Sequence, residues 1–260
     1  MPRILAALVG LSAGAAVVIL IDRGEPSTDP AAVAATSAPI LTYHAISEPP
    51  AGARHRQLFV APDDFAAEMR WLLEQGFQAV TLDELHRGWR EGSSLPAKPV
   101  VISFDDGLET QFTEALPVLR DLGWPGVLNL KVESLRQGEL TEAMIGRMIA
   151  AGWEVDSHTI THPKLTRLGE HALEREVAGS RRILEERLQV PVEFFCYPYG
   201  RFDPRVVEVV RDADYLGATT TRVGLASATA NPYRLPRLRV SGSAGLDEFA
   251  AEIDSLRAGA

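Results

Sequence analysis

The chain has 260 residues, of which 46% are apolar and 23% charged, and these values are typical of a globular protein with one sizeable core. Its 35 acidic residues outnumber its 26 lysines and arginines, and a formal net charge of -9 argues against a nucleic-acid partner. The single cysteine, Cys196, excludes an internal disulfide and a cysteine-rich zinc site. Any metal site must therefore use His, Asp and Glu ligands.

The N-terminal region contains an apolar run at residues 4–21 that carries no charged residue. As a helix, this run would be about 27 Å long, close to the hydrocarbon thickness of a bilayer. It predicts either an uncleaved membrane anchor or a signal peptide, and in both cases the leader spans residues 1–23. Either alternative places the rest of the chain outside the cytoplasm, in a periplasm or at the cell surface.

Residues 24–39 are rich in Pro, Ala, Ser and Thr and have no periodic apolar pattern, which predicts a linker. The folded domain is then expected at residues 40–257, a length that suits one α/β domain. Within it, short apolar runs alternate with amphipathic stretches, as in βα units around a parallel sheet. We predict strands at 40–44, 79–82, 100–104, 126–130, 154–157, 194–197 and 217–220.

Helical patterns separate and follow these strands. They lie at 63–75, 82–90, 109–122, 141–150, 169–189, 204–212 and 246–256. A barrel and an open doubly wound sheet both fit this order of elements. In either fold, we expect the chemistry at the carboxyl ends of the strands.

Two adjacent carboxylates, Asp105 and Asp106, follow the predicted strand at 100–104 and precede a glycine. Their mutual repulsion favours either binding of a cation by one or retention of a proton by the other. A turn stabilised by an aspartate side chain is the structural alternative for this triplet.

His158 and His162 follow the predicted strand at 154–157. Two histidines four residues apart on one helical turn can bind a single ion, although two surface histidines are the alternative for this pair alone. Because both motifs follow strands, they can meet at one end of the sheet. One carboxylate and two imidazoles then predict a divalent metal site with open positions.

A third segment, at residues 194–200, combines a buried strand with a Pro-Tyr-Gly turn. A strand and a turn account for its composition. The functional interpretation is that the backbone N–H of Tyr199 points into the site as an oxyanion donor. Cys196, on the same strand, is expected to lie in the core.

The segments SFDDG, SHTITH and FCYPYG, in this order and at these spacings, resemble the first three motifs of the NodB-homology polysaccharide deacetylases, carbohydrate esterase family 4. The opening LTYH and the later TTT are similar to the branch that includes the poly-N-acetylglucosamine deacetylases. The resemblance spans about residues 40–250. It implies an α/β fold, a distorted (β/α) barrel with about seven parallel strands.

By this resemblance, Asp105 is the general base, and Asp106, His158 and His162 bind a divalent metal, for which zinc is expected. The implied activity is hydrolysis of N-acetyl groups on the amino sugars of an extracytoplasmic polysaccharide. An O-acetyl esterase acting on xylan or a similar glycan is one alternative. A glycan-binding module that has lost catalysis is another.

The chain departs from the family pattern at three places. Cys196 stands where many members have an arginine that restrains the base, and the fourth motif, which bears a tryptophan, is missing. The late Leu-x-His motif, the source of the general-acid histidine, is also missing. Arg237 is the nearest candidate for the arginine, with a solvated strand residue as the alternative. His44, at the end of the first strand, is the candidate proton donor, and a structural role near the metal is its alternative.

Overall fold

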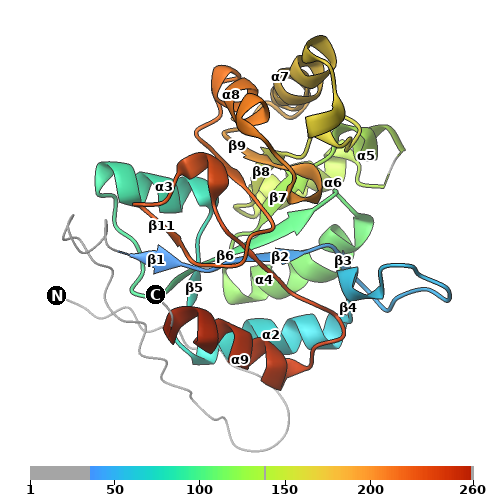
Figure 1. Ribbon diagram of the computed structural model, residues 1–260. Helices are drawn as coiled ribbons and strands as arrows, with labels where there is room; N and C mark the ends of the chain where they lie inside the picture. Colours follow the sequence, from blue (N-terminus) through green and yellow to red (C-terminus); the bar gives the residue numbers. More distant parts are fainter. Residues whose placement is uncertain (1–35, 138, 259–260) are drawn as a thin grey trace, which may run out of the picture.

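The computed structural model describes residues 36–137 and 139–258 of the chain (Figure 1). The predicted leader and nearly all of the predicted linker fall on residues 1–35 and lie outside the described residues. Within the described part, no helix combines the length and the apolar character needed to cross a membrane.

A parallel sheet of eight strands forms the centre of the fold (Figure 1). Seven strands follow one hydrogen-bonded path in the order β10-β9-β8-β7-β6-β2-β12, and β5 pairs with the start of β6. Their bounds are β2 (Ile40–Tyr43), β5 (Gln78–Ala79), β6 (Pro99–Asp105), β7 (Val127–Leu130), β8 (Glu154–Ser157), β9 (Phe194–Cys196), β10 (Gly217–Thr219) and β12 (Leu238–Arg239). The curved sheet and its helices confirm the predicted distorted (β/α) barrel with about seven parallel strands.

All seven predicted strands take part in this sheet, and β12 is the member that the sequence did not predict. Its two ladder residues pair with Leu41 and Thr42 of β2, and two residues are too few to show a periodic pattern. The strand predicted at 79–82 is shorter because Thr81 already caps the next helix through a capping box with Glu84. Two small two-stranded sheets were also not predicted. They pair β1 (Ser37–Ala38) with β11 (Ala226–Ser227) and β3 (Ala45–Ile46) with β4 (Phe59–Val60).

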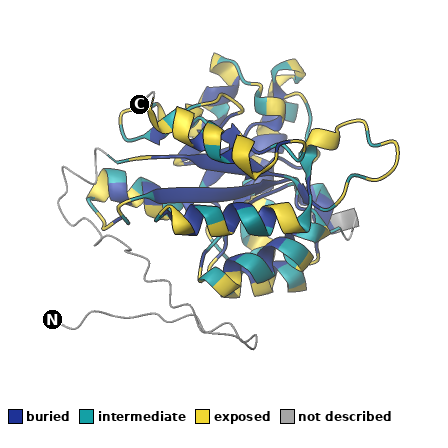
Figure 2. Cartoon of the chain, turned by 90° about the horizontal axis from the view of Figure 1, so that it is seen from below, coloured by how far each residue is buried: buried dark blue, intermediate teal, exposed yellow. Residues whose placement is uncertain are grey.

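The helices pack against the sheet through their buried faces and expose the opposite faces (Figure 2). They are α2 (Pro62–Glu74), α3 (Leu82–Glu91), α4 (Leu116–Leu122), α5 (Val132–Gln137), α6 (Glu142–Ala150), α7 (Glu170–Leu188), α8 (Pro204–Asp212) and α9 (Leu246–Ala258). A π-helical segment, Gln111–Ala115, precedes α4 and takes up the first part of the helix predicted at 109–122. The short helix α5 was not predicted. Each of the other helices matches a predicted one.

The inward face of the sheet changes from apolar to polar along the strands. On β6, side chains alternate between the two faces, so Val101, Ser103 and Asp105 share one face. Val101 belongs to an apolar cluster with Ile40 of β2 and Phe194 of β9, both near the amino ends of their strands. This cluster fills the barrel near the amino ends of these strands, whereas Ser103 and Asp105 lie towards the carboxyl end of β6.

Candidate active site

The structure brings the three predicted metal ligands together. Asp106 follows β6, and His158 and His162 follow β8, two strands away along the sheet. The Nε2 atoms of His158 and His162 each lie 3.7 Å from Asp106 Oδ1. The two imidazole rings have centroids 4.7 Å apart. One carboxylate oxygen and two imidazole nitrogens thus face a common point.

The expectation that the two histidines share a helical turn is wrong. Thr159 and His162 have positive φ angles of 71° and 59°, and the segment between the histidines is an irregular loop. His162 N donates to Thr159 Oγ1 at 2.9 Å. The buried carboxylate of Glu176 on α7 accepts bonds from Ile160 N and Thr161 N at 2.9 Å. Side-chain hydrogen bonds therefore hold the loop in the shape that brings both imidazoles to Asp106.

The orientation of His158 suits a metal ligand. Its Nδ1 lies 2.8 Å from the backbone oxygen of Cys196. A carbonyl oxygen can only accept, so Nδ1 carries the hydrogen, and in the neutral ring the Nε2 lone pair faces Asp106. The donor set of Asp106, His158 and His162 therefore fits a divalent ion of the type that two imidazoles and one carboxylate bind.

A second group of ligand types, Asp105, His158 and Cys196, also lies within 4.8 Å. This group does not suit a metal, because Asp105 is already bound to Arg237 and the Nδ1 atom of His158 is already bonded to a carbonyl. The Asp106 group is therefore the better metal site.

The two imidazoles have opposite electrostatic environments. Burial and the nearby His158 lower the pKa of His162 to about 4, so its ring is neutral at pH 7. Burial also acts to lower the pKa of His158, but Cys196, Asp105 and Asp106 outweigh it and raise that pKa to about 10. The surroundings of His158 therefore favour a positive charge, and a proton and a metal ion compete for its Nε2 atom.

Asp105, the predicted base, is buried in a network of donors. Arg237 Nη1 donates to Oδ1 at 2.8 Å and Nη2 donates to Oδ2 at 2.9 Å, so the guanidinium binds both oxygens. Asn129 Nδ2 donates to Oδ1 at 2.8 Å. Burial alone would raise the pKa of Asp105, but the Arg237 charge outweighs it and holds that pKa well below its usual range. Asp105 is therefore a carboxylate.

Arg237 is not the solvated strand residue that the sequence left as an alternative. It precedes β12, and only 2% of its surface is exposed. Arg237 Nε donates to the Thr220 carbonyl at 2.9 Å, and Nη2 donates to Cys196 Sγ at 3.2 Å. Cys196 is buried, as expected, and its small side chain lies against the ion pair of Asp105 and Arg237.

His44 and Tyr199 also lie at this end of the barrel. His44 follows β2; burial lowers its pKa, and the charges of Asp105 and Asp106 oppose the shift. Gln111 Nε2 donates to the backbone oxygens of His44 and Asp105, at 3.1 and 2.7 Å, and fixes the two strand ends together. The Tyr199 ring lies 4.5 Å from the His162 ring and is 53% exposed.

The turn that holds Tyr199 is a 3-10 turn at Pro198–Gly200, in which Tyr199 and Gly200 have φ angles of 59° and 64°. A Cβ atom at Gly200 would lie 2.0 Å from Thr221 Oγ1, so this position requires glycine. The tight turn places the Tyr199 ring beside that of His162.

Two residues of the site were not predicted from the sequence. Asn129 and Gln111 bond to Asp105, through its side chain and its backbone respectively. Asn129 had a visible signal, because it is a polar residue inside the otherwise apolar strand run at 126–130. Gln111 lies in a segment with an ordinary helical pattern and had none.

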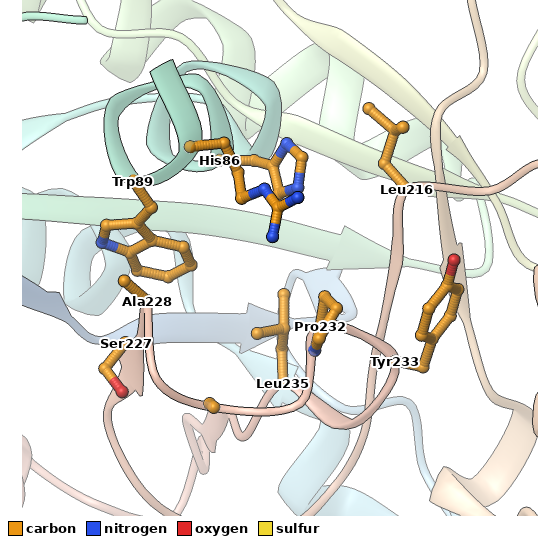
Figure 3. A pocket seen from close by; sticks show the side chains of 10 residues that line it. His86, Trp89, Leu216, Ser227, Ala228, Pro232, Tyr233 and Leu235 are labelled. Carbon is orange, nitrogen blue, oxygen red and sulfur yellow. The ribbon is translucent and has the colours of Figure 1, made fainter. Parts of the chain in front are cut away.

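A separate pocket of about 320 Å³ lies away from these residues (Figure 3). His86 and Trp89 of α3 face Leu216 and residues of the segment that follows β10, among them Pro232 (Figure 3). Leu216 immediately precedes β10, and the His86 ring contacts Phe194, the first residue of β9. The pocket is therefore at the amino ends of the strands, and the catalytic candidates are at the carboxyl ends.

Comparison with known proteins agrees with this geometry. Residues 92–218 match the family described as polysaccharide deacetylase. A candidate polysaccharide deacetylase of Bacillus subtilis (strain 168), YxkH, is 30% identical over 220 residues, which cover 84% of this chain and 77% of that protein. The poly-β-1,6-N-acetyl-D-glucosamine N-deacetylase of Escherichia coli (strain K12) is 22% identical over 258 residues, covering 82% of this chain and 38% of that protein.

A similar fold occurs in a solved structure, the Streptococcus pyogenes deacetylase PplD in complex with acetate. The TM-score is 0.78 at 24% sequence identity, and the match covers 84% of this chain and 98% of that chain. This likeness concerns the fold.

Proposed function

Because the chain belongs to the polysaccharide deacetylase family, a family of hydrolases, we propose that it removes N-acetyl groups from the amino sugars of a polysaccharide outside the cytoplasm. One observation carries the proposal. The metal-binding group of Asp106, His158 and His162 adjoins an ionised carboxylate, Asp105, that its neighbours hold in place. A relative that acts on poly-β-1,6-N-acetyl-D-glucosamine supports the choice of substrate.

Asp106, His158 and His162 would hold the divalent ion, and deacetylases of carbohydrate esterase family 4 are metal-dependent. Such an ion acts as a Lewis acid that polarises a carbonyl group and lowers the pKa of water. Two nitrogens and one oxygen form a set that zinc commonly accepts, and zinc is therefore the proposed metal.

Asp105 accepts the proton of the attacking water. Its Oδ1 already accepts two bonds, from Arg237 and Asn129. Its Oδ2 accepts one strong bond from Arg237 and faces the Cys196 thiol at 3.7 Å, which is a weak contact. A carboxylate oxygen has two acceptor sites, so Oδ2 is the oxygen with capacity for a proton. Arg237 is a positioning residue that fixes the direction of this oxygen.

The Tyr199 backbone N–H stabilises the oxyanion that develops on the acetyl group, and His44 protonates the departing amine. An amine must be protonated to leave, whereas a nitrophenolate leaves as an anion. His44→Ala should therefore reduce activity on acetylated glucosamine oligomers about 10²-fold or more and reduce activity on nitrophenyl acetate far less. Equal losses on both substrates, with metal content unchanged, would assign His44 a structural role.

The apolar run at residues 4–21 supports the extracytoplasmic location, because the leader predicted at residues 1–23 would either anchor the chain in a membrane or be removed as a signal peptide. The two outcomes differ in the mature protein. An anchored chain stays with membranes after carbonate extraction, whereas a cleaved chain begins within the linker when its N-terminus is sequenced. A chain that is neither membrane-bound nor exported would contradict the proposed location.

The decisive experiment measures acetate released by the purified, zinc-loaded protein. The panel contains acetylated poly-β-1,6-glucosamine, chitin oligomers and acetylated xylan. We expect the wild type to release acetate from the amino sugars. Asp106→Ala should abolish this release, and Asp212→Asn, on the exposed face of α8, should preserve it. Release from xylan alone would show an O-acetyl esterase, and no release with metal bound would show a binding module.

A further inference from the structure

Two of the three lysines in the chain lie beside the candidate site. The lysines are Lys98, Lys131 and Lys164, whereas arginine makes up the rest of the 26 basic residues. Lys131 directly follows β7, and its neighbours in sequence bond to the site loop: His158 N donates to the Leu130 carbonyl, and Val132 N donates to that of Thr159. The backbone of Lys131 is therefore held beside that of His158.

Lys164 reaches the same place from the loop after β8. Its Nζ lies 5.7 Å from the centroid of the Tyr199 ring. The Tyr199 ring in turn lies 4.5 Å from that of His162. The exposed ring of Tyr199 thus forms a shelf that has a metal ligand on one side and an ammonium group on another. A flat, exposed ring of this kind suits packing against the apolar face of a sugar.

Neither lysine has a counter-ion in the described part of the chain, where no acidic oxygen approaches within 4.0 Å of either Nζ. The acidic side chains of the site already have partners. Asp105 is paired with Arg237, and Asp106 faces His158 and His162. On a chain of net charge -9, two uncompensated ammonium groups beside one site indicate a ligand with negative charge.

We infer that the substrate carries an acidic group, a carboxylate or a phosphate, close to the acetylated sugar, and that Lys164 binds this group beside the Tyr199 shelf with Lys131 as a second positive charge. The inference rests on the proposed deacetylase function. It narrows the substrate from acetylated glycans in general to anionic ones. Lys164 is then a specificity-determining residue, and its effect depends on the charge of the substrate.

The test compares three acetylated oligomers of equal length. One is neutral N-acetylglucosamine, one alternates N-acetylglucosamine with N-acetylmuramic acid, which bears a carboxylate, and one carries phosphate on its sugars. The wild type should have a higher kcat/KM on at least one acidic oligomer than on the neutral one. Because surface ion pairs are screened, this preference should shrink between 0.05 and 0.5 M salt, concentrations that we choose to span the change in Debye length from roughly 14 to 4 Å.

Lys164→Gln should lower the ratio of acidic to neutral kcat/KM by about two- to fivefold, the size expected when a partly exposed ion pair is lost. Lys164→Arg keeps the charge and should restore most of the ratio. Lys98→Gln is the matched control, because Lys98 Nζ binds the carbonyl of Gln75 away from the site, and it should leave the ratio unchanged.

Two results overturn the inference. The first is a wild type that treats the neutral and both acidic oligomers alike. The second is a Lys164→Gln variant that loses the same factor on all three. In either case acetate is still released and the deacetylase function stands. A wild type that releases no acetate from any of the three contradicts the proposed function itself, and the inference fails with it.

Discussion

Two groups of buried carboxyls face the inside of the same barrel, and their surroundings differ in one respect. Asp105, at the end of β6, has the Arg237 guanidinium across both of its oxygens. Glu154 and Asp156 lie two residues apart on the same face of β8. One oxygen of each accepts a backbone N–H, from Asp83 at 2.9 Å and from Phe194 at 3.0 Å. Their remaining oxygens, Glu154 Oε1 and Asp156 Oδ2, have no partner in the described structure.

The presence or absence of a cation decides what each group does. With Arg237, the pKa of Asp105 stays low in spite of burial. Beside Glu154 and Asp156, burial acts without a compensating positive charge, so it raises the pKa of Glu154 to about 7 and that of Asp156 well above its usual range. One proton shared between the two carboxyls would satisfy both unpartnered oxygens. The barrel therefore keeps Asp105 ionised and holds one proton on the pair formed by Glu154 and Asp156.

The largest effect should come from removing the charge of the ionised carboxyl. Asp105→Asn keeps the size and most of the hydrogen-bonding shape of the side chain but removes its proton affinity. We expect kcat to fall by about 10²–10⁴, with one metal ion still bound per chain. Mass spectrometry of the metal content and acetate release measure the two quantities. Asp106→Asn alters a proposed metal ligand and serves as the comparison. If Asp105→Asn lost as much metal as Asp106→Asn, the roles of the two aspartates would be misassigned.

Removing the cation instead should make Asp105 resemble the β8 pair. Arg237→Leu leaves a buried carboxylate without its partner, and we expect a loss of about 3–5 kcal/mol in the free energy of unfolding at pH 7. Without the guanidinium, burial raises the pKa of Asp105. The loss of stability should therefore shrink as the pH falls and Asp105 takes up a proton. Denaturant unfolding at pH 5 and pH 7 checks this, and a loss that is equal at both would contradict it.

A double variant sharpens the same point. If the cost of Arg237→Leu is the stranded charge, then adding Asp105→Asn should recover part of it, because a neutral amide is easier to bury than a carboxylate. The double variant should be more stable than Arg237→Leu alone by about 1–3 kcal/mol at pH 7. Additive losses would indicate that Arg237 contributes mainly through its packing and its bond to Thr220.

The sequence predicted those parts of the molecule that local patterns determine. Seven strands, the end of the sheet that holds the site, and the residues Asp105, Asp106, His158 and His162 all follow from apolar runs and from the polar residues after them. Asp105 and Arg237 are 132 residues apart in the sequence. Their contact depends on β12, a strand of only two residues that directly follows Arg237, and no local pattern predicts it. The loop geometry of His158 and His162 depends on the carboxylate of Glu176, which the helical pattern of α7 does not distinguish from a surface acid.

The same limit applies to the β8 pair. The run at 154–157 predicts a strand, and the alternation of a strand places Glu154 and Asp156 on one face. Whether that face meets solvent, a cation or another carboxyl depends on strands β7 and β9, which lie on either side. The sequence therefore predicts the position of a buried acid more readily than its protonation.

The smallest expected effect tests the protonated pair and has the opposite sign from the others. In the unfolded chain both carboxyls lose their protons near pH 4, whereas the folded pair retains one to about pH 7 or above. Folding therefore binds a proton in this window, and the free energy of unfolding should fall as the pH rises from about 4 to 7.

Asp156→Asn supplies an amide N–H in place of the shared proton, and its oxygen can still accept from Phe194 N. We expect this variant to be more stable than the wild type by about 1–2 kcal/mol at pH 8, with a smaller difference at pH 4. Asp212→Asn, on the exposed face of α8, is the control and should change neither value. If Asp156→Asn were instead less stable than the wild type at pH 8, Asp156 would be ionised and would have a partner. The Arg237 guanidinium would then not explain the difference between the two carboxyl sites.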